Sequence, residues 1–221
     1  MNLYYISKKI MIKNKFIVIE GLEGAGKTHA CFYVKKTLKK NNIKNVVLVR
    51  QPGSTPIAEK IRNLIKAYHT EKITRETELL LVYAARIQLV ETIIKPALQR
   101  GDWVISDRHD LSSLAYQGGG LGISENMINQ LKNLLLKDFT PDLTLYLDVI
   151  PETGLKRILK RSPLDRIENR SLTFFKKTRK SYLNNVKYDN KIITIDANLD
   201  IKNVTKNIKK QLLKWLQKQF I

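Results

Sequence analysis

The residues with the clearest chemical potential form a glycine-rich loop that ends in Lys27 and Thr28. Residues 21–28 read GLEGAGKT and satisfy the pattern G-x-x-x-x-G-K-[ST]. An apolar run at 16–19 precedes the loop, and a helix-like stretch follows it. This order of strand, loop and helix predicts a nucleoside triphosphate site, with contacts from Gly21, Leu22, Glu23, Gly24, Ala25, Gly26, Lys27 and Thr28.

Each part of this loop has a defined task in binding a triphosphate. Glycines lack a Cβ atom, so the backbone can curl and point successive N–H groups at phosphate oxygens. Lys27 is predicted to reach the β- and γ-phosphates as a catalytic cation, and the Thr28 hydroxyl is predicted to bind Mg²⁺.

Further charged residues follow two other predicted strands. Arg50 ends the second strand, and Asp107 and Arg108 follow the third. Ligands of open α/β sheets bind at the carboxyl ends of strands, where an Asp can hold Mg²⁺ and an Arg can bind a phosphate through two hydrogen bonds. The alternative for Asp107 and Arg108 is a surface ion pair. His109 either braces this loop or touches a ligand.

Two helical stretches carry cations that this chemistry could use. Arg86 lies three residues after Tyr83 on a predicted helix, where it either reaches a ligand or extends from a core helix to solvent. Residues 156–166 concentrate Lys and Arg before and within a predicted mobile loop. Guanidinium groups from such a loop stabilise the charge of phosphoryl transfer. A solvated basic helix is the alternative.

Short β-like runs alternate with long helical patterns, which predicts an α/β fold with a parallel sheet. The strands are dense in Val, Ile and Leu, as expected for strands covered on both faces. They are predicted at residues 15–20, 45–50, 103–106, 143–148 and 191–196. Helices are predicted near residues 28–40, 57–67, 76–99, 124–137, 152–160, 172–184 and 201–218.

The chain contains no internal repeat and no low-complexity linker, which predicts one domain over residues 15–221. Residues 1–14 are predicted to be a poorly ordered N-terminal extension. A flexible glycine loop is expected at 118–122, and a charged loop at 162–170.

The 221-residue chain carries 40 Lys+Arg against 20 Asp+Glu, a formal net charge of +20. This charge could indicate nucleic-acid binding, but the lysines are scattered along helices without an RNA-binding signature. We therefore favour a compositional bias on an ordinary fold.

No apolar run approaches the ~20 residues of a membrane span, and the first fifteen residues lack signal-peptide features. The single cysteine, Cys31, excludes an intramolecular disulfide framework and predicts a cytoplasmic location.

A series of motifs follows in order along the chain: IEGLEGAGKT, the turn at 50–55, YAAR at 83–86, DRHDLSSLAYQGGG at 107–120, PDLTLYLD at 141–148 and LDRIE at 164–168. Together, these motifs resemble those of bacterial thymidylate kinases (dTMP kinases). The resemblance runs from about residue 16 to the C-terminus, and its ordered series is far more specific than a phosphate loop alone.

The resemblance implies a P-loop kinase fold, with a five-stranded parallel sheet flanked by helices on both faces and a mobile lid. It implies a homodimer that transfers the γ-phosphoryl group of ATP to dTMP with Mg²⁺, without a covalent enzyme intermediate. Arg50 and Arg108 would hold the dTMP phosphate, while Asp107 would organise Mg²⁺ and water at the catalytic centre. The implied dTMP contacts are Glu23, Arg50, Arg86, Arg108, Ser113, Tyr116 and Gln117.

The resemblance also indicates where a catalytic arginine should lie. The phosphate loop has no basic residue between Gly21 and Gly26. The catalytic arginine is therefore expected from the lid, at Arg161, with Arg157 and Arg166 in support.

Four residues depart from the family's usual pattern. Gln51 stands where Glu is usual, Ser54 where the second Gly of PGG is usual, and His29 where a small hydroxyl residue is usual. Val82 occupies the position of a Phe that stacks on thymine. Since the cations and metal ligands remain, these changes are expected to affect substrate affinity more than chemistry.

Three alternative functions stay open at this point. The nearest is a kinase for another nucleoside monophosphate. The second is a nucleotide-dependent nucleic-acid-binding protein, which the net charge alone suggests. A third is a non-catalytic relative, although the intact Lys27, Thr28, Asp107 and Arg108 argue against it.

Overall fold

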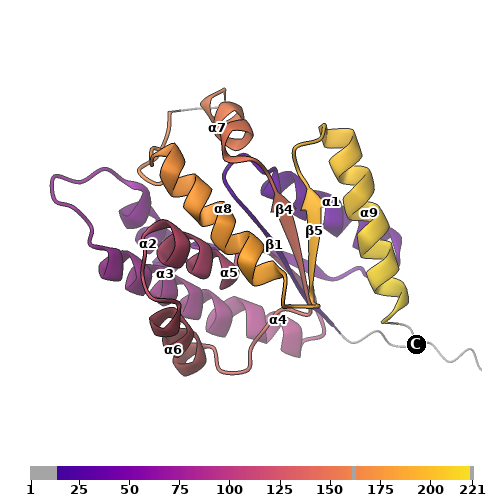
Figure 1. Cartoon of the computed structure of the whole chain (residues 1–221). Coiled ribbons are helices and arrows are strands. Elements are labelled where there is room, and N and C mark those ends of the chain that lie inside the picture. Colours follow the sequence, from indigo (N-terminus) through magenta and orange to yellow (C-terminus); the bar gives the residue numbers. More distant parts are fainter. Residues whose placement is uncertain (1–13, 161–162, 220–221) are drawn as a thin grey trace, which may run out of the picture.

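A computed structural model describes residues 14–160 and 163–219 of the chain. Its centre is a five-stranded sheet in which every neighbouring pair is parallel, with the order β2-β3-β1-β4-β5 (Figure 1). The strands are β1 (Phe16–Gly21), β2 (Val46–Arg50), β3 (Trp103–Asp107), β4 (Leu143–Asp148) and β5 (Ile192–Asp196).

Helices occupy most of the chain between the strands. The α-helices are α1 (Lys27–Lys40), α2 (Pro56–Lys66), α3 (Arg75–Leu89), α4 (Lys95–Gln99), α5 (Leu111–Ser113), α6 (Glu125–Leu135), α7 (Pro151–Leu159), α8 (Leu172–Val186) and α9 (Ile201–Gln217). Two π-helical segments are η1 (Val90–Ile94) and η2 (Leu114–Gly120). Several helices begin with a side chain that accepts a backbone N–H hydrogen bond, as helix N-termini require, namely Thr55, Thr74, Ser124, Ser171 and Asp200.

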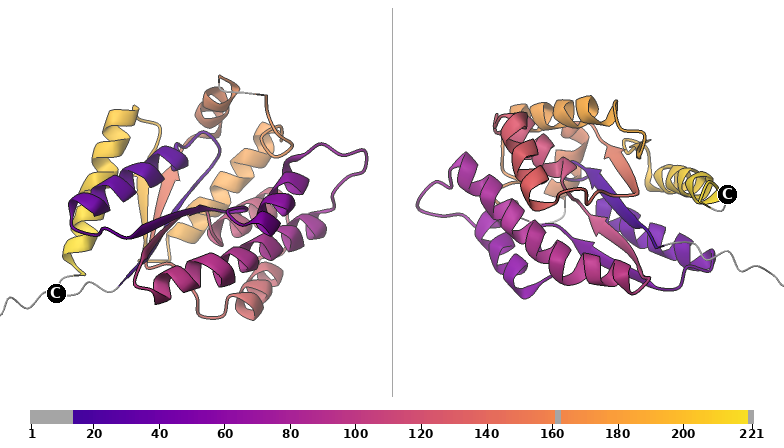
Figure 2. Two further views of the ribbon diagram at one scale, coloured as in Figure 1. Left: turned by 180° about the vertical axis from the view of Figure 1, so that it is seen from behind. Right: turned by 90° about the horizontal axis from the view of Figure 1, so that it is seen from below.

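The alternation of β1 side chains divides the core between the two faces of the sheet. Ile17 and Ile19 pack in the same cluster as α1 and α9, whereas Phe16 and Val18 pack in the cluster of α3 and η1. Figure 2 shows α1 and α9 together on one face and α3 on the other. The predicted five-stranded parallel sheet with helices on both faces is therefore confirmed.

The prediction of a flexible loop at 118–122 is wrong for its first three residues. Gly118, Gly119 and Gly120 belong to η2, which packs on α8. A Cβ atom on Gly119 would lie 2.4 Å from Ser181 Cβ, and one on Gly120 would lie 2.4 Å from the ring of Phe174. These glycines allow two helical segments to approach closely, so here they do not indicate flexibility.

The single helix predicted over 76–99 is observed as α3, η1 and α4 in direct succession. The wider π turn ends at Ile94, two residues before Pro96, which has no N–H to continue the α-helical hydrogen bonds. The short helix α5 and the π segment η2 were not among the predicted helices.

Several predictions concern residues that the structure does not describe. Residues 1–13 of the predicted extension and Arg161, the expected catalytic arginine, lie outside the described residues. No helix within 14–160 or 163–219 has both the length and the hydrophobicity needed to cross a bilayer.

Candidate active site

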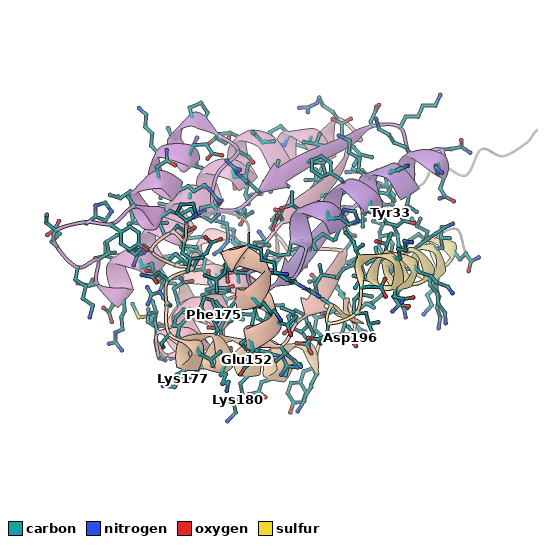
Figure 3. All side chains as sticks on the ribbon, turned by 90° about the horizontal axis from the view of Figure 1, so that it is seen from above. Tyr33, Glu152, Phe175, Lys177, Lys180 and Asp196 are labelled. Carbon is teal, nitrogen blue, oxygen red and sulfur yellow. The ribbon has the colours of Figure 1, made fainter. Side chains whose placement is uncertain are left out.

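A cavity of about 560 Å³ opens at the carboxyl edge of the sheet. The phosphate loop, the ends of β2 and β3, helices α2, α3 and α7, η2 and the segment at 165–168 all contribute to its wall. Figure 3 looks onto this side, with Tyr33 of α1 facing α9 and with Glu152 of α7 beside α8. The cavity brings together most of the residues predicted from the sequence: Glu23, Gly24, Gly26, Lys27, Thr28, Arg50, Arg86, Asp107, Arg108, Tyr116 and Gln117.

The phosphate loop holds its lysine against its own backbone. Lys27 Nζ donates a hydrogen bond of 2.8 Å to the carbonyl oxygen of Leu22. Burial, together with the nearby charge of Arg108, lowers the pKa of Lys27 from 10.5 to about 8. Leu22 and Ala25 are buried and anchor the loop in the core, so they reach a ligand only through their backbone.

The two predicted metal ligands lie next to each other. Thr28 Oγ1 donates a 3.0 Å hydrogen bond to Asp107 Oδ2, which joins the start of α1 to the end of β3. Mg²⁺ in nucleotide sites is held by one or two protein oxygens together with phosphates and water. This pair fits that chemistry. Within the described residues, no three His, Cys, Asp or Glu side chains group as a metal-binding cluster.

Arg108 lies at the centre of a polar network beside the phosphate loop. Its guanidinium donates to Glu23 Oε1 at 2.7 Å, to the Tyr116 hydroxyl at 3.1 Å and to Ser112 Oγ at 3.1 Å. The Tyr116 hydroxyl in turn donates to Glu23, and the ring of Tyr116 lies 4.8 Å from the guanidinium carbon. Three of the predicted dTMP contacts, Glu23, Arg108 and Tyr116, are thus held as one unit.

The backbone at Arg108 is in the left-handed region, with φ at +75°. This conformation is uncommon for a residue with a Cβ atom and is often found at functional sites. It is held by a hydrogen bond from Arg108 N to the Ile19 carbonyl at 2.9 Å, and by Ser106 Oγ, which donates to the Arg108 carbonyl at 2.7 Å. The turn therefore directs Arg108 over the phosphate loop.

Arg86 is 1% exposed, and its guanidinium is held on several sides. Nε donates to Gln51 Oε1 at 3.0 Å, and Nη2 donates to the His109 carbonyl at 3.0 Å and to Ser113 Oγ at 2.8 Å. Nη1 lies 3.5 Å from Asp110 and retains a second N–H. Ser113 is fully buried, and its hydroxyl accepts the hydrogen bond from Arg86, so it holds the guanidinium of this arginine in position.

Gln51 and His109 form a neutral pair behind Arg86. Since Gln51 Oε1 accepts from Arg86, its Nε2 donates to His109 Nδ1, 3.0 Å away, and the proton of His109 is on its Nε2. Burial, with the adjacent Arg86, lowers the pKa of His109 to about 3. His109 is therefore an uncharged side chain that supports the loop through Gln51; since it also lines the cavity, a contact with a ligand stays open as its second role.

Arg50 and Ser54 are tied together through α2. Arg50 donates to Glu59 Oε2 at 2.9 Å, and the N–H of Ser54 donates to Glu59 Oε1 at 2.6 Å. Ser54 has φ at +67°, where glycine is the usual residue. Its hydroxyl accepts from Arg50 N at 2.8 Å, so the serine adds a hydrogen bond in a backbone conformation that is costly for it.

Three cavity residues on α3 are spaced by one helical turn each. Glu78, Val82 and Arg86 recur at i, i+4 and i+8, so they share the face that points to the cavity. Sequence reasoning found Arg86 and Val82 but missed Glu78, although this spacing could have revealed it. Arg62 was missed in the same way: it lies one helical turn from the two buried residues of α2, and it lines the cavity.

Two of the basic residues predicted to support the lid, Arg157 and Arg166, are held by backbone oxygens and by Glu78. Arg157 Nη1 donates to the Ala197 carbonyl at 2.7 Å and to the Gly24 carbonyl at 3.3 Å. Arg166 Nε donates to the Ile65 carbonyl at 2.7 Å, and its Nη2 lies 2.6 Å from Glu78 Oε2.

His29, which follows the phosphate loop, has an exposed side chain. Its Nε2 lies 3.4 Å from Thr205 Oγ1.

Comparison with known proteins gives a consistent result over almost the whole chain. The family profile described as Thymidylate kinase matches residues 19–208. The thymidylate kinase of Buchnera aphidicola subsp. Schizaphis graminum (strain Sg) is 72% identical over 212 residues, which cover 96% of this chain and 100% of that protein. The thymidylate kinase of Wigglesworthia glossinidia brevipalpis is 52% identical over 233 residues, covering 95% of this chain and 100% of that protein.

Proposed function

The chain belongs to the thymidylate kinase family, and from that premise we propose that it phosphorylates dTMP to dTDP with ATP. The observation that carries this proposal is the continuity of one cavity from the phosphate loop to Arg86 and Gln117. A triphosphate at Lys27 and a monophosphate at Arg108 would lie at neighbouring strand ends. Positioning and charge neutralisation would then provide the catalysis.

The base end of the cavity has a donor and acceptor pattern that fits thymine. Arg86 retains an N–H at Nη1, which can donate to the 4-carbonyl oxygen of the base. Gln117 uses its Nε2 to bind Glu78, so its carbonyl oxygen can accept from the N3–H of the base. Cytosine carries the opposite pattern at both positions, a 4-amino donor and an N3 acceptor.

We also propose that Thr28 and Asp107 hold Mg²⁺ together with the triphosphate. When bound, the ion would neutralise the charge of the phosphate oxygens. The protein's own part is to orient these two oxygens by the hydrogen bond between them. We further propose that the protein forms a homodimer and is located in the cytoplasm. Arg161 is proposed as its catalytic arginine.

An acceptor panel tests the proposed function. The full chain is incubated with ATP, Mg²⁺ and one of dTMP, dUMP, CMP, UMP or GMP, and ADP formation is measured. The highest kcat/KM is expected with dTMP. A higher value with another acceptor would favour a kinase of different specificity. No turnover with any acceptor, combined with salt-sensitive nucleic-acid binding, would favour the nucleic-acid alternative.

Substitution of Val82 by Phe is expected to tighten dTMP binding. Stacking of a base on an aromatic ring is worth about 1–3 kcal/mol relative to alanine, and Val82 already lines the cavity, so we expect a gain of about 1 kcal/mol and a several-fold lower Kd. The kcat should change little, because stacking acts on ground and transition states alike.

A dTMP titration by calorimetry measures this change, with Leu80→Phe as the matched control because Leu80 is 54% exposed on the same helix. Unchanged affinity would mean that another group already covers the base. Weaker affinity would mean that the added ring overpacks the cavity.

The lowered pKa of Lys27 predicts a pH dependence of nucleotide capture. The ammonium form binds phosphate, so kcat/KM for ATP should be constant below about pH 8 and should fall by up to about tenfold per pH unit above it. A profile between pH 7.5 and 10 at constant ionic strength checks this, with circular dichroism to confirm that the fold persists. A profile that is flat through pH 10 would contradict it.

A further inference from the structure

Glu78 is a buried carboxylate that none of the roles proposed above requires for catalysis. It is 1% exposed and lies on α3, one turn before Val82. Arg166 Nη2 lies 2.6 Å and Arg170 Nη2 lies 2.8 Å from its Oε2. Two guanidinium groups thus hold one oxygen of a buried carboxylate, and such a charge is retained only where it is paired.

The second carboxylate oxygen of Glu78 makes a different contact. Gln117 Nε2, from η2, donates a hydrogen bond of 3.1 Å to Glu78 Oε1. A carboxylate only accepts hydrogen bonds, whereas either end of an amide can face a neighbour. With Glu78 beside it, Gln117 must turn its NH2 group toward α3, and its carbonyl oxygen is then the end available to a ligand.

We propose that Glu78 is a specificity-determining residue that selects pyrimidine bases with an N3–H by fixing the orientation of the Gln117 amide. This inference rests on the proposed function and adds to it the residue that fixes the Gln117 amide in the orientation that discriminates against cytosine. Gln117 is 5% exposed and lines the cavity, so its orientation decides whether that wall accepts or donates a hydrogen bond. Arg166 and Arg170 pair with the Glu78 carboxylate and hold it in place.

Glu78→Gln is the direct test of this proposal. A glutamine at position 78 can donate as well as accept, so it permits Gln117 to turn its NH2 group toward the base. The full chain is assayed with ATP and with dTMP or dCMP as acceptor. We expect the ratio of kcat/KM for dTMP over dCMP to fall by about tenfold or more, mainly through the two KM values, because misplaced polar groups penalise binding of the correct base.

Two further variants separate the role of the charge from a general loss of structure. Glu76→Gln is the matched control, since Glu76 lies on the same helix with its side chain 47% exposed and pairs with Arg75; its ratio should equal that of the unchanged chain. Glu78→Asp keeps the negative charge, so its ratio should stay within about threefold even where KM rises.

An unchanged ratio in Glu78→Gln, with both kcat/KM values lowered equally, would overturn the proposal and leave Glu78 a purely structural residue. The proposal would also be overturned if the ratio of kcat/KM for dTMP over dCMP fell as far in Glu78→Asp as in Glu78→Gln. If Glu78→Gln has no cooperative melting transition, Gln117→Leu decides: a lost ratio supports the proposal and a retained ratio overturns it. Absence of dTMP turnover by the unchanged chain would instead be a failure of the proposed function.

Discussion

Lys27→Ala is expected to lower kcat by at least about 10²–10³-fold, the range seen when one preorganised electrostatic contact is removed from an active site. Lys27 is the cation of the phosphate loop, and its ammonium already lies at the loop, 2.8 Å from the Leu22 carbonyl. Alanine has no charge to place on the β- and γ-phosphates. Steady-state ADP formation at saturating ATP and dTMP measures the loss.

The matched control for this substitution is Lys36→Ala. Lys36 is on the same helix but exposed, so its loss should leave kcat within about twofold and should change the net charge of the protein equally. Circular dichroism should show an intact fold for both variants. A kcat for Lys27→Ala near that of the control would remove the phosphate-loop mechanism from consideration.

Arg108→Lys is expected to lower kcat/KM for dTMP by about 10²-fold, mainly by raising KM for dTMP. The guanidinium of Arg108 reaches Glu23, Tyr116 and Ser112 at once. A lysine ammonium is a single point charge that cannot reproduce this fork or bind a phosphate through two hydrogen bonds. Kinetics with dTMP as the varied substrate measures the effect.

The same substitution should also destabilise the protein. Acceptors left without their guanidinium partner cost about 1–3 kcal/mol each when they are buried. Thermal unfolding should therefore show a lower melting temperature for Arg108→Lys than for Arg100→Lys, a control whose side chain is 62% exposed. If Arg108→Lys kept its kcat/KM for dTMP, the dTMP phosphate would have to be held by another cation, such as Arg50 or Arg62.

The structure shows the hydrogen bonds made by two of the four residues that depart from the family pattern, Gln51 and Ser54. Gln51 accepts from Arg86 and donates to His109, so an uncharged amide links an arginine to a neutral imidazole. Ser54 carries a left-handed backbone and adds a hydrogen bond to Arg50. Both residues support cations of the cavity, so they are expected to influence substrate affinity more than the transfer step.

Contiguous motifs allowed much of this protein to be predicted from its sequence. The phosphate loop is eight consecutive residues between a strand and a helix, and local backbone geometry is enough to determine what it presents. The five strands were predicted to within one residue at each end, because runs of Val, Ile and Leu between helical patterns indicate buried parallel strands. These features depend on neighbours in the chain and need no tertiary contacts.

Tertiary structure decided which side chains meet. Glu78 and Gln117 are 39 residues apart, and Glu78 and Arg170 are 92 apart, so no local pattern predicts their contact. The same holds for Gly119 and Gly120, since their sequence is typical of a loop but α8 packs directly against them. A polar side chain or a glycine acquires its role from the partner that the fold places beside it, and that partner depends on strand order and helix packing. The sequence by itself therefore determined the chemistry of the phosphate loop, whereas the orientation of the base-binding side chains was determined only by the packing of α3, η2 and the segment around Arg166.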